Sequence, residues 1–389
     1  MRRFMKQRLV TERKTNKKMK KILILTGHYL PGHRDGGPLR TIINITDVLG
    51  DEYEFFILCL DRDHGDTEAY SSIFRNKWNK VGKANVWYVS PGGFTFELLS
   101  KFASQMDLVY LCSFYDDYGY KTLLLKKQRK ISCPVIVASM GVFSKGALSH
   151  KGLKKRVFIN GCKIIGLFKN ITWSVTSELE AEDVKREIGN NIKYVIAEDL
   201  PRTTIPGYQE RKEPFSIAFL SRICPQKNLL AAVKILKSVR LDVKFYVYGP
   251  AQDKAYWERC KKEMKSFPLN ITWKYCGDVP SEDVQFKLAQ HDVLLFPTKG
   301  ENYGHVIFEA LSVGCIPIIS DQTPWVEIKE NNAGFICSLD NVDNFVNAIE
   351  KIAQMDSTDR RKMAENGVCI AKEKVEKNNR ETGYRKIFG

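Results

Sequence analysis

The stretch "VLLFPTKGENYGHVIFEALSVGCIPIIS", residues 293–320, is the most informative part of the chain. A short apolar run ends at Pro297, a polar turn follows, a helix-length segment starts near Gly304, and a second apolar run occupies 316–320. This order of strand, helix and strand is typical of a parallel sheet covered by helices. Glu309 stands inside the apolar helix. Because a buried, unpaired carboxylate is costly, we expect Glu309 to hold a ligand or a partner.

The same alternation continues along the chain. Between two series of apolar runs, residues 199–214 contain three prolines, a glycine and a charge cluster, which is typical of an interdomain linker. We therefore predict an α/β protein with two doubly wound, Rossmann-like domains that face each other across a cleft. The predicted strands lie at 21–27, 53–60, 86–90, 107–113, 134–139, 171–177 and 192–198, and then at 215–221, 243–249, 271–277, 293–298, 316–320 and 333–338.

The predicted domain limits follow from these series. We expect a disordered basic arm at 1–19, an N-terminal domain at 20–205 and a second domain at 206–370. We expect the tail at 371–389 to form a helix that packs back on the N-terminal domain. The chain of 389 residues is long enough for two such cores.

Composition restricts the class of protein and its partners. No run of about 18 apolar residues is present, and the basic N-terminus precedes only a short apolar stretch, so we expect a cytoplasmic protein without a signal peptide or a membrane span. The net charge of +16 favours an anionic partner, whether nucleic acid, a phosphorylated small molecule or an acidic membrane surface. Ten cysteines show no metal-binding spacing and are expected to be reduced.

Glu301 and Glu309 are the first candidate site residues. A helix that begins after the carboxyl end of a strand is where open α/β sheets bind ligands. Glu301, in the turn, could accept hydroxyl groups of a sugar, or it could only complement the helix dipole. Glu309 lies one turn deeper than His305 and could accept both hydroxyls of a ribose, or it could pair with a lysine.

Two glutamates separated by seven residues, an "NYG" turn, an apolar helix with Gly314 and the following "CIPIIS" and "PWVEI" segments resemble the signature of family 4 glycosyltransferases, which are retaining enzymes of the GT-B fold. The resemblance implies that Glu301 binds the donor sugar and that Glu309 binds the ribose of the nucleotide. It also implies that the turn residues Asn302, Tyr303 and Gly304 meet the sugar and phosphate through their backbone amides.

A second segment, "IAFLSRICPQKNLLAAVKIL" at 217–236, places Arg222 and Lys227 beside the carboxyl end of a strand. Fixed cations there would stabilise the charge that develops on a departing diphosphate. The alternative is that both are ordinary surface cations. The second domain of the resembled family opens with the same arrangement, which implies catalytic roles for Arg222 and Lys227 and no requirement for a metal ion or another cofactor.

The loop "TGHYLPGHRDGGPLR" at 26–40 resembles the glycine-rich loop of that family, which implies that Gly36 and Gly37 approach the donor. Many family members carry a histidine after a central strand of the first domain, but this chain has Ser139 or Met140 at the corresponding place. Ser139 and His150 are therefore the acceptor-side candidates.

The predicted function is transfer of a sugar from a nucleotide-diphosphate-sugar donor to a glycan or lipid-linked acceptor. Basic clusters at 125–130 and 150–156 suggest contact with an anionic membrane or a lipid-diphosphate acceptor. Three alternatives stay open. Asp61 and Asp63 form the DxD of metal-dependent GT-A transferases, a nucleotide-sugar epimerase could share the GT-B fold, and charge alone would permit a nucleic-acid-binding module, although no motif for one is present.

Overall fold

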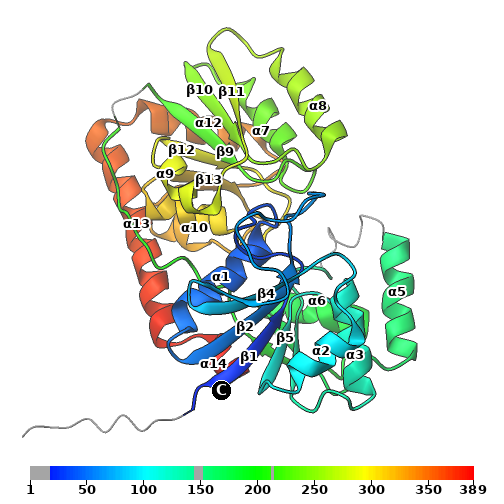
Figure 1. Ribbon diagram of the computed structural model, residues 1–389. Coiled ribbons are helices and arrows are strands. Elements are labelled where there is room, and N and C mark those ends of the chain that lie inside the picture. Colours follow the sequence, from blue (N-terminus) through cyan, green and yellow to red (C-terminus); the bar gives the residue numbers. More distant parts are fainter. Residues whose placement is uncertain (1–17, 144–151, 212–213) are drawn as a thin grey trace, which may run out of the picture.

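The computed structural model describes residues 18–143, 152–211 and 214–389. The chain forms two α/β domains, one above the other in Figure 1, each built on its own sheet. Residues 1–17 of the expected basic arm lie outside the described part of the chain.

The N-terminal domain contains an eight-stranded sheet in the order β3-β4-β2-β1-β5-β6-β7-β8. All neighbouring strands are parallel except the edge pair β3–β4. The strands are β1 (Lys20–Leu25), β2 (Tyr53–Leu60), β3 (Trp78–Val81), β4 (Ala84–Val89), β5 (Leu108–Leu111), β6 (Val135–Ala138), β7 (Thr172–Val175) and β8 (Lys193–Ile196). The helices are α1 (Gly37–Leu49), α2 (Phe96–Ala103), α3 (Asp117–Lys127), α5 (Gly152–Ile164) and α6 (Glu178–Ile188).

The second domain contains a six-stranded parallel sheet in the order β11-β10-β9-β12-β13-β14. Its strands are β9 (Ser216–Leu220), β10 (Val243–Tyr248), β11 (Ile271–Gly277), β12 (Val293–Phe296), β13 (Ile316–Ser320) and β14 (Phe335–Cys337). Its helices are α7 (Leu229–Leu236), α8 (Lys254–Met264), α9 (Val284–Leu288), α10 (His305–Ser312), α11 (Glu327–Glu330) and α12 (Val342–Gln354), and a single 3-10 turn, η1 (Ser281–Asp283), precedes α9.

Each predicted strand is present, because continuous apolar runs such as β1 and β12 are buried in the centre of a parallel sheet. Strand β3 was missed. Its residues alternate between exposed and half-buried and pair antiparallel at the sheet edge, so the segment lacks an apolar run.

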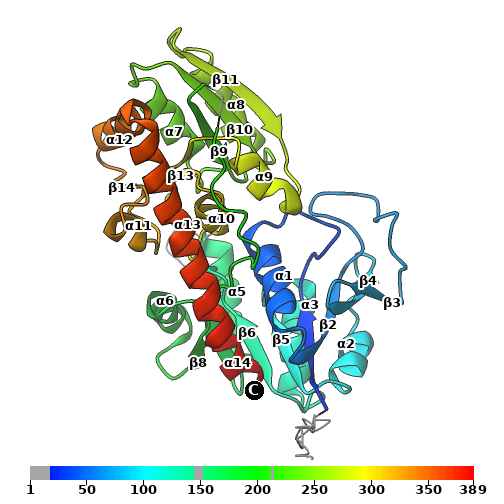
Figure 2. The ribbon, with the colours of Figure 1, turned by 90° about the vertical axis from the view of Figure 1, so that its left-hand side faces the viewer.

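Two C-terminal helices connect the domains. Helix α13 (Ser357–Arg380) contacts α10 in the second domain and runs down to the first, as the red helix in Figure 2 shows. Helix α14 (Gly383–Phe388) then packs on β8, and its buried side chains Tyr384, Ile387 and Phe388 belong to the hydrophobic core of the N-terminal domain. The last helix of the chain and the first strand therefore belong to the same hydrophobic core.

The two parallel sheets turn their carboxyl ends toward each other. The segments that directly follow β6, β7, β9, β10 and β12 all line one cavity between the domains. The glycine-rich loop before α1 lines the same cavity. This arrangement brings strand ends and helix N-termini from both domains to one site, which is where α/β sheets bind ligands.

Candidate active site

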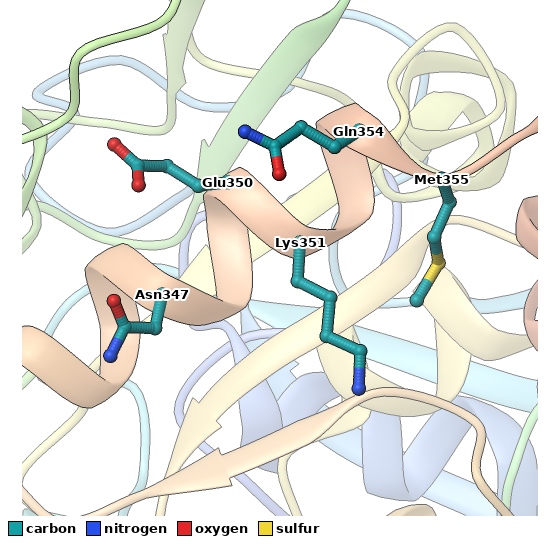
Figure 3. A pocket seen from close by; sticks show the side chains of 5 residues that line it. All are labelled: Asn347, Glu350, Lys351, Gln354 and Met355. Carbon is teal, nitrogen blue, oxygen red and sulfur yellow. The ribbon is translucent and has the colours of Figure 1, made fainter.

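The interdomain cavity has a volume of about 1220 Å³. Its walls include Arg222, Lys227, Glu301 and Glu309 from the second domain and the α1 N-terminus from the first. A second cavity, of about 350 Å³, lies along α12. Its side chains all come from one short segment and do not converge on a common point (Figure 3), so the interdomain cavity is the candidate active site.

Glu301 and Lys227 form an ion pair inside the cavity. The Lys227 Nζ lies 2.6 Å from Oε1 and 2.8 Å from Oε2 of Glu301, and the Thr298 hydroxyl donates a 2.8 Å hydrogen bond to Oε1. Both side chains are largely buried, with 16% and 9% of their surfaces exposed. The pair fixes a cation and a carboxylate side by side, and both retain capacity for further hydrogen bonds.

Arg222 lies opposite the glycine-rich loop. Gly36 has φ +65°, and a Cβ atom there would lie 3.2 Å from Arg222 Nε. A side chain at Gly36 would therefore meet both an unfavourable backbone conformation and the guanidinium group. A Cβ atom at Gly37, by contrast, would have no atom within 4 Å. Within the described residues, the Arg222 guanidinium has no carboxylate within ion-pair distance, and it faces the cavity.

Glu309 is held by an arginine of the other domain. The Arg40 Nη2, from α1, lies 3.1 Å from Glu309 Oε1, and both side chains are almost completely buried. Burial raises the pKa of Glu309, while the charges of Arg40 and Arg202 oppose that rise. Glu309 Oε1 is in ion-pair contact with Arg40 Nη2 but accepts no aligned hydrogen bond, and Arg40 Nη1 donates none in the described structure, although both residues line the cavity. A ligand that offers a donor and an acceptor here would satisfy both.

Asn302 contacts the N-terminal domain directly. Its Nδ2 donates a 3.1 Å hydrogen bond to Glu180 Oε1, and the Gly141 backbone amide donates a 2.5 Å bond to the same oxygen. The backbone amide and hydroxyl of Thr176 donate to Glu180 Oε2 at 2.7 Å and 2.8 Å. Glu180, a buried residue, therefore joins the turn of one domain to two strand ends of the other.

The turn continues into α10. Tyr303 is buried, and its carbonyl accepts a hydrogen bond from Trp325 Nε1. Gly304 has φ +82° and directly precedes the helix. The predicted turn residues therefore lie at the N-terminus of α10, on the cavity wall.

Of the two acceptor-side candidates, Ser139 does not reach the cavity. Ser139 is fully buried, and its hydroxyl donates a 3.1 Å hydrogen bond to the carbonyl of Ser174. The next residue, Met140, lines the cavity instead, because the chain turns there with φ +44°. Met140 therefore replaces Ser139 as the acceptor-side candidate within the described residues. His150 lies outside the described residues.

A buried polar junction lies at the start of α10, among the residues that line the cavity. The Thr41 hydroxyl donates a 3.0 Å hydrogen bond to Asp199 Oδ1 and lies 3.2 Å from His305 Nε2. Burial raises the pKa of Asp199 to about 7, and burial lowers the pKa of His305 to about 3. His305 is accordingly a neutral hydrogen-bonding group at physiological pH. The junction joins α1, the linker and α10 without a full charge pair.

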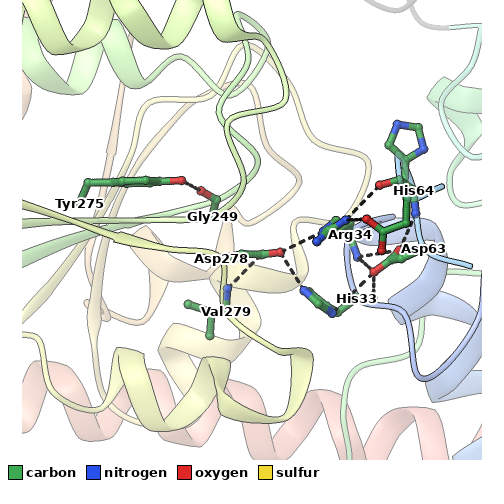
Figure 4. Close-up of polar contacts among 9 residues, drawn as sticks. His33, Arg34, Asp63, His64, Gly249, Tyr275, Asp278 and Val279 are labelled. Atoms are coloured by element: carbon green, nitrogen blue, oxygen red, sulfur yellow. Dashed lines mark hydrogen bonds and ion pairs between the residues drawn. The ribbon is translucent and has the colours of Figure 1, made fainter. Parts of the chain in front are cut away.

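A further interdomain contact joins two of the segments that line the cavity (Figure 4). The His33 Nε2 lies 2.8 Å from Asp278 Oδ2, and Arg34 Nε lies 3.7 Å from the same oxygen. Arg34 also pairs with Asp66. These contacts tie the glycine-rich loop to the end of β11, so the two domains meet on both sides of the cavity.

Asp61 and Asp63 do not form a metal-binding DxD site. Asp61 is fully buried and pairs with Arg62 and Arg75 at 2.9 Å and 3.3 Å. Asp63 accepts hydrogen bonds from the backbone amides of His33 and His64 at 2.8 Å and 2.7 Å. Both carboxylates hold loops together instead of facing the cavity.

The sequence patterns did not predict the residues that the N-terminal domain contributes to the site. For Arg40 a signal was present, since an arginine in the apolar segment "PLRTIINI" is as conspicuous as Glu309 in its helix. Glu180 and Asp199 carried no such signal, because each follows a strand in an ordinary polar loop or helix start. Their roles depend on contacts with residues more than 100 positions away in sequence.

Comparisons with known proteins agree with this geometry. Residues 202–368 match the family model described as glycosyl transferases group 1. The fold is similar to that of HepE from Anabaena, solved with UDP and glucose, with a TM-score of 0.71 and 16% identity over 93% of this chain and 97% of that one. No curated protein sequence matched the chain.

Two further solved structures share the fold. Sucrose-phosphate synthase from Thermosynechococcus elongatus has a TM-score of 0.70 and 16% identity over 95% of this chain and 99% of that one. WaaG, a glycosyltransferase involved in lipopolysaccharide biosynthesis, has a TM-score of 0.60 and 14% identity over 92% and 98%. The predicted GT-B fold is confirmed, and the GT-A alternative is wrong, because the chain has two Rossmann-like domains with the cavity between them.

Proposed function

We propose that the chain is a glycosyltransferase that moves a sugar from a nucleotide-diphosphate donor to a glycan or lipid-linked acceptor with retention of configuration. The match of residues 202–368 to the glycosyl transferases group 1 model supports this proposal. One observation carries the proposal. Two cations and two carboxylates, Arg222, Lys227, Glu301 and Glu309, converge on one large cavity at the carboxyl ends of the second sheet.

These four side chains determine how the donor binds. Arg222 and Lys227 bind the diphosphate and stabilise the negative charge that grows on it as the bond to the sugar breaks. Glu309 accepts the ribose hydroxyls, and Arg40 completes that site from the opposite domain. Glu301 accepts sugar hydroxyls while Lys227 keeps it oriented, and the backbone of Tyr303 and Gly304 approaches the sugar and phosphate at the N-terminus of α10.

The chemical step needs no metal ion in this proposal, because Arg222 and Lys227 supply the positive charge at the diphosphate. The acceptor approaches from the N-terminal domain, on the side of Met140 and the glycine-rich loop. Its hydroxyl attacks the same face of the sugar that the phosphate leaves, and the departing phosphate oxygen takes the hydroxyl proton. Configuration at the reacting carbon is then retained.

The acceptor side has a surface suited to an anionic membrane. Helix α5 exposes Val157 and Ile164, with 65% and 86% of their surfaces accessible, beside exposed Lys154, Arg156 and Lys163. Basic and apolar side chains on one helix favour contact with the headgroup region of a bilayer. No helix of the described residues is long and apolar enough to cross a membrane. We therefore place the protein at the cytoplasmic face of the membrane as a peripheral enzyme.

The test is a donor scan. Purified protein is mixed with UDP-, GDP- and ADP-sugars, with and without EDTA, and binding and slow donor hydrolysis are measured. We expect one donor class to bind and hydrolyse equally well in EDTA, and the Glu309→Ala variant to bind it at least ten-fold more weakly. Unchanged affinity in that variant would refute the ribose assignment, and a strict requirement for a divalent ion would refute the metal-free reaction.

A second experiment addresses the chemistry. With an acceptor that supports turnover, nuclear magnetic resonance of the product shows whether the anomeric configuration of the donor is kept. Retention is expected, and an inverted product contradicts the same-face reaction. Conversion of the donor to its epimer without any acceptor would instead favour an epimerase.

A further inference from the structure

Three potential metal ligands meet in the N-terminal domain, beside the catalytic cavity and not among its lining residues. His28 follows β1, Asp35 lies in the glycine-rich loop, and His64 follows β2. One ligand atom from each residue lies within 4.8 Å of the other two. Neither the proposed transfer reaction nor the donor site uses these three side chains.

The geometry points to an ion between them. His28 Nδ1 lies 2.9 Å from Asp35 Oδ2, and His64 Nδ1 lies 3.8 Å from Asp35 Oδ1. The imidazole rings of the two histidines meet edge to face, with centroids 5.6 Å apart. The first contact is a hydrogen bond, but 3.8 Å is too long for one. The protein therefore brings His64 to Asp35 without a direct bond that would hold it there.

The spacing suits a tetrahedral metal ion. Zinc–nitrogen and zinc–oxygen bonds of about 2.0–2.2 Å place two ligand atoms roughly 3.3–3.5 Å apart. The two distances from Asp35 lie on either side of that value, so small side-chain rotations would bring all three ligands into range. Two imidazoles and one carboxylate are a ligand set for zinc and its first-row neighbours, whereas calcium and magnesium prefer oxygen ligands.

The residues around the three ligands also favour binding of a metal ion. Asp63, the buried carboxylate of the "DRDH" segment, accepts the His64 backbone amide and also binds the backbone of the glycine-rich loop at His33. It therefore fixes the two loops that carry the ligands relative to each other. The charges of Asp63 and Asp116 lie close enough to act on His28, and the cation of Arg222 acts on Asp35. The three carboxylates of Asp35, Asp63 and Asp116 outnumber that cation, and such an excess of negative charge attracts a dication.

We propose that His28, Asp35 and His64 form a site for one divalent transition-metal ion of the zinc class. With three protein ligands, a tetrahedral ion keeps one open position for water or an anionic oxygen. His64, whose side chain is 58% exposed, marks the solvent side of the site. The site is separate from the donor groups, so it can be tested without donor or acceptor.

The experiment uses the full chain with any affinity tag removed, stripped with EDTA and then desalted. Zn²⁺ is titrated against a chromophoric chelator, and Co²⁺ is added to a second sample for its visible absorption spectrum. We expect one high-affinity equivalent of Zn²⁺ and weak visible Co²⁺ bands without the near-ultraviolet bands of thiolate ligands. That last point matters because all ten cysteines are unpaired.

Substitutions of the ligand residues test where the ion binds. His64→Ala, at an exposed position, and Asp35→Ala should each weaken Zn²⁺ binding at least ten-fold. His33→Ala, in the same loop, is the matched control: it removes the side-chain contacts with Asp278 and Asp63 at 2.8 Å and 3.6 Å, keeps the backbone hydrogen bond to Asp63, and should leave the affinity unchanged. Absence of a stoichiometric site in the wild-type protein, thiolate bands with Co²⁺, or equal affinity in His64→Ala would each overturn the proposal. Donor binding by His64→Ala in EDTA, measured in parallel, reports on the transferase site alone.

Discussion

At the scale of single residues, Glu309 illustrates how an interdomain contact can create a ligand site. The carboxylate is buried in an apolar helix, and its cation comes from the opposite domain at 3.1 Å. Besides this ion pair, Oε1 accepts no aligned hydrogen bond and Arg40 Nη1 donates none in the described structure. The pair thus joins the two domains and keeps hydrogen-bonding capacity for a nucleotide.

A double-mutant cycle tests this pair. Removal of Arg40 leaves a buried charge without its partner, which costs about 3–5 kcal/mol in fully buried pairs. We expect Arg40→Ala to lower the free energy of unfolding by an amount of this order and Glu309→Ala to reverse most of the loss. Urea unfolding of both single variants and the double variant gives the coupling energy. The exposed pair Arg380–Glu376 is the control, with a coupling below about 1 kcal/mol. A coupling as small at Arg40 would contradict the interpretation.

Arg222 has a different predicted effect. If its charge matters most when the diphosphate departs, Arg222→Ala should lower kcat by about 100-fold or more, as losses of single charge-stabilising groups do, and change the donor Kd much less. Arg259→Ala, at an exposed position of α8, should change neither value. Steady-state kinetics and equilibrium donor binding separate the two effects. Equal losses in affinity and turnover would mean that Arg222 binds the ground state and the transition state alike.

At the scale of elements, the glycine-rich loop and the start of α1 show why two adjacent glycines are not equivalent. Gly36 has φ +65° and lies against Arg222, whereas a Cβ atom at Gly37 would meet nothing within 4 Å. We expect Gly36→Ala to cost about 1–2 kcal/mol from the backbone alone and to displace Arg222. Gly37→Ala should leave thermal stability unchanged. Melting temperatures of both variants, with kcat/KM for Gly36→Ala, make the comparison. A stable, fully active Gly36→Ala would show that the loop adapts.

The terminal helix α14 is a second element with a testable role. Phe388 is fully buried, and its ring lies 5.7 Å from Phe55 of β2 and 5.6 Å from Tyr110 of β5. Phe388→Ala should lower the free energy of unfolding by about 3–5 kcal/mol, because it leaves a cavity in the core. Phe286→Ala, at a 63% exposed position, should cost far less. If both variants unfold at the same denaturant concentration, α14 does not contribute to the core as the contacts indicate.

At the scale of the whole molecule, the two domains meet through several polar contacts around one cavity. His33–Asp278 joins the glycine-rich loop to the end of β11, Glu180–Asn302 involves the turn before α10, and the Asp199–Thr41–His305 junction lies at the start of α10. The contacts come from loops and helix ends of both domains. Closure of the site and stability of the folded chain therefore depend on the same residues.

The Asp199 junction predicts a pH dependence. The folded-state pKa of about 7 exceeds the unfolded value, so the folded protein binds this proton more tightly than the unfolded chain. The resulting stabilisation is complete below the unfolded pKa, near 3.9, and is lost as the pH rises to about 7. His305 stays neutral throughout this range, since its pKa is lowered to about 3.

The Asp199→Asn variant has no titrating group at this position, so its free energy of unfolding does not fall for this reason as the pH rises. Relative to the wild type, this variant should gain roughly 2–3 kcal/mol in free energy of unfolding between pH 5 and pH 8. Urea unfolding at the two pH values measures the difference, with Asp340→Asn at an exposed position as the control. A difference that does not change with pH would show that Asp199 is ionised in the folded protein throughout.

The sequence by itself determined the features that depend on neighbouring residues. Apolar runs predicted the buried strands of both sheets, and the spacing of Glu301 and Glu309 around one turn placed both on the wall of the cavity, because helix and strand periods are local properties. Strand β3 escaped because an exposed edge strand needs no apolar run.

Only the tertiary structure decided which distant side chains meet. It paired Arg40 with Glu309, joined Glu180 to Asn302, and turned Ser139 into the sheet so that Met140 reaches the cavity. In the tertiary structure Asp63 also binds two loops, and His64 lies close to Asp35. The contacts of Arg40 and Glu180 depend on the packing of the two domains against each other, and the others depend on how distant segments of the N-terminal domain fold together. Because a charged residue in a polar loop has the same local pattern whether it meets solvent or a partner, the sequence carries no record of the outcome.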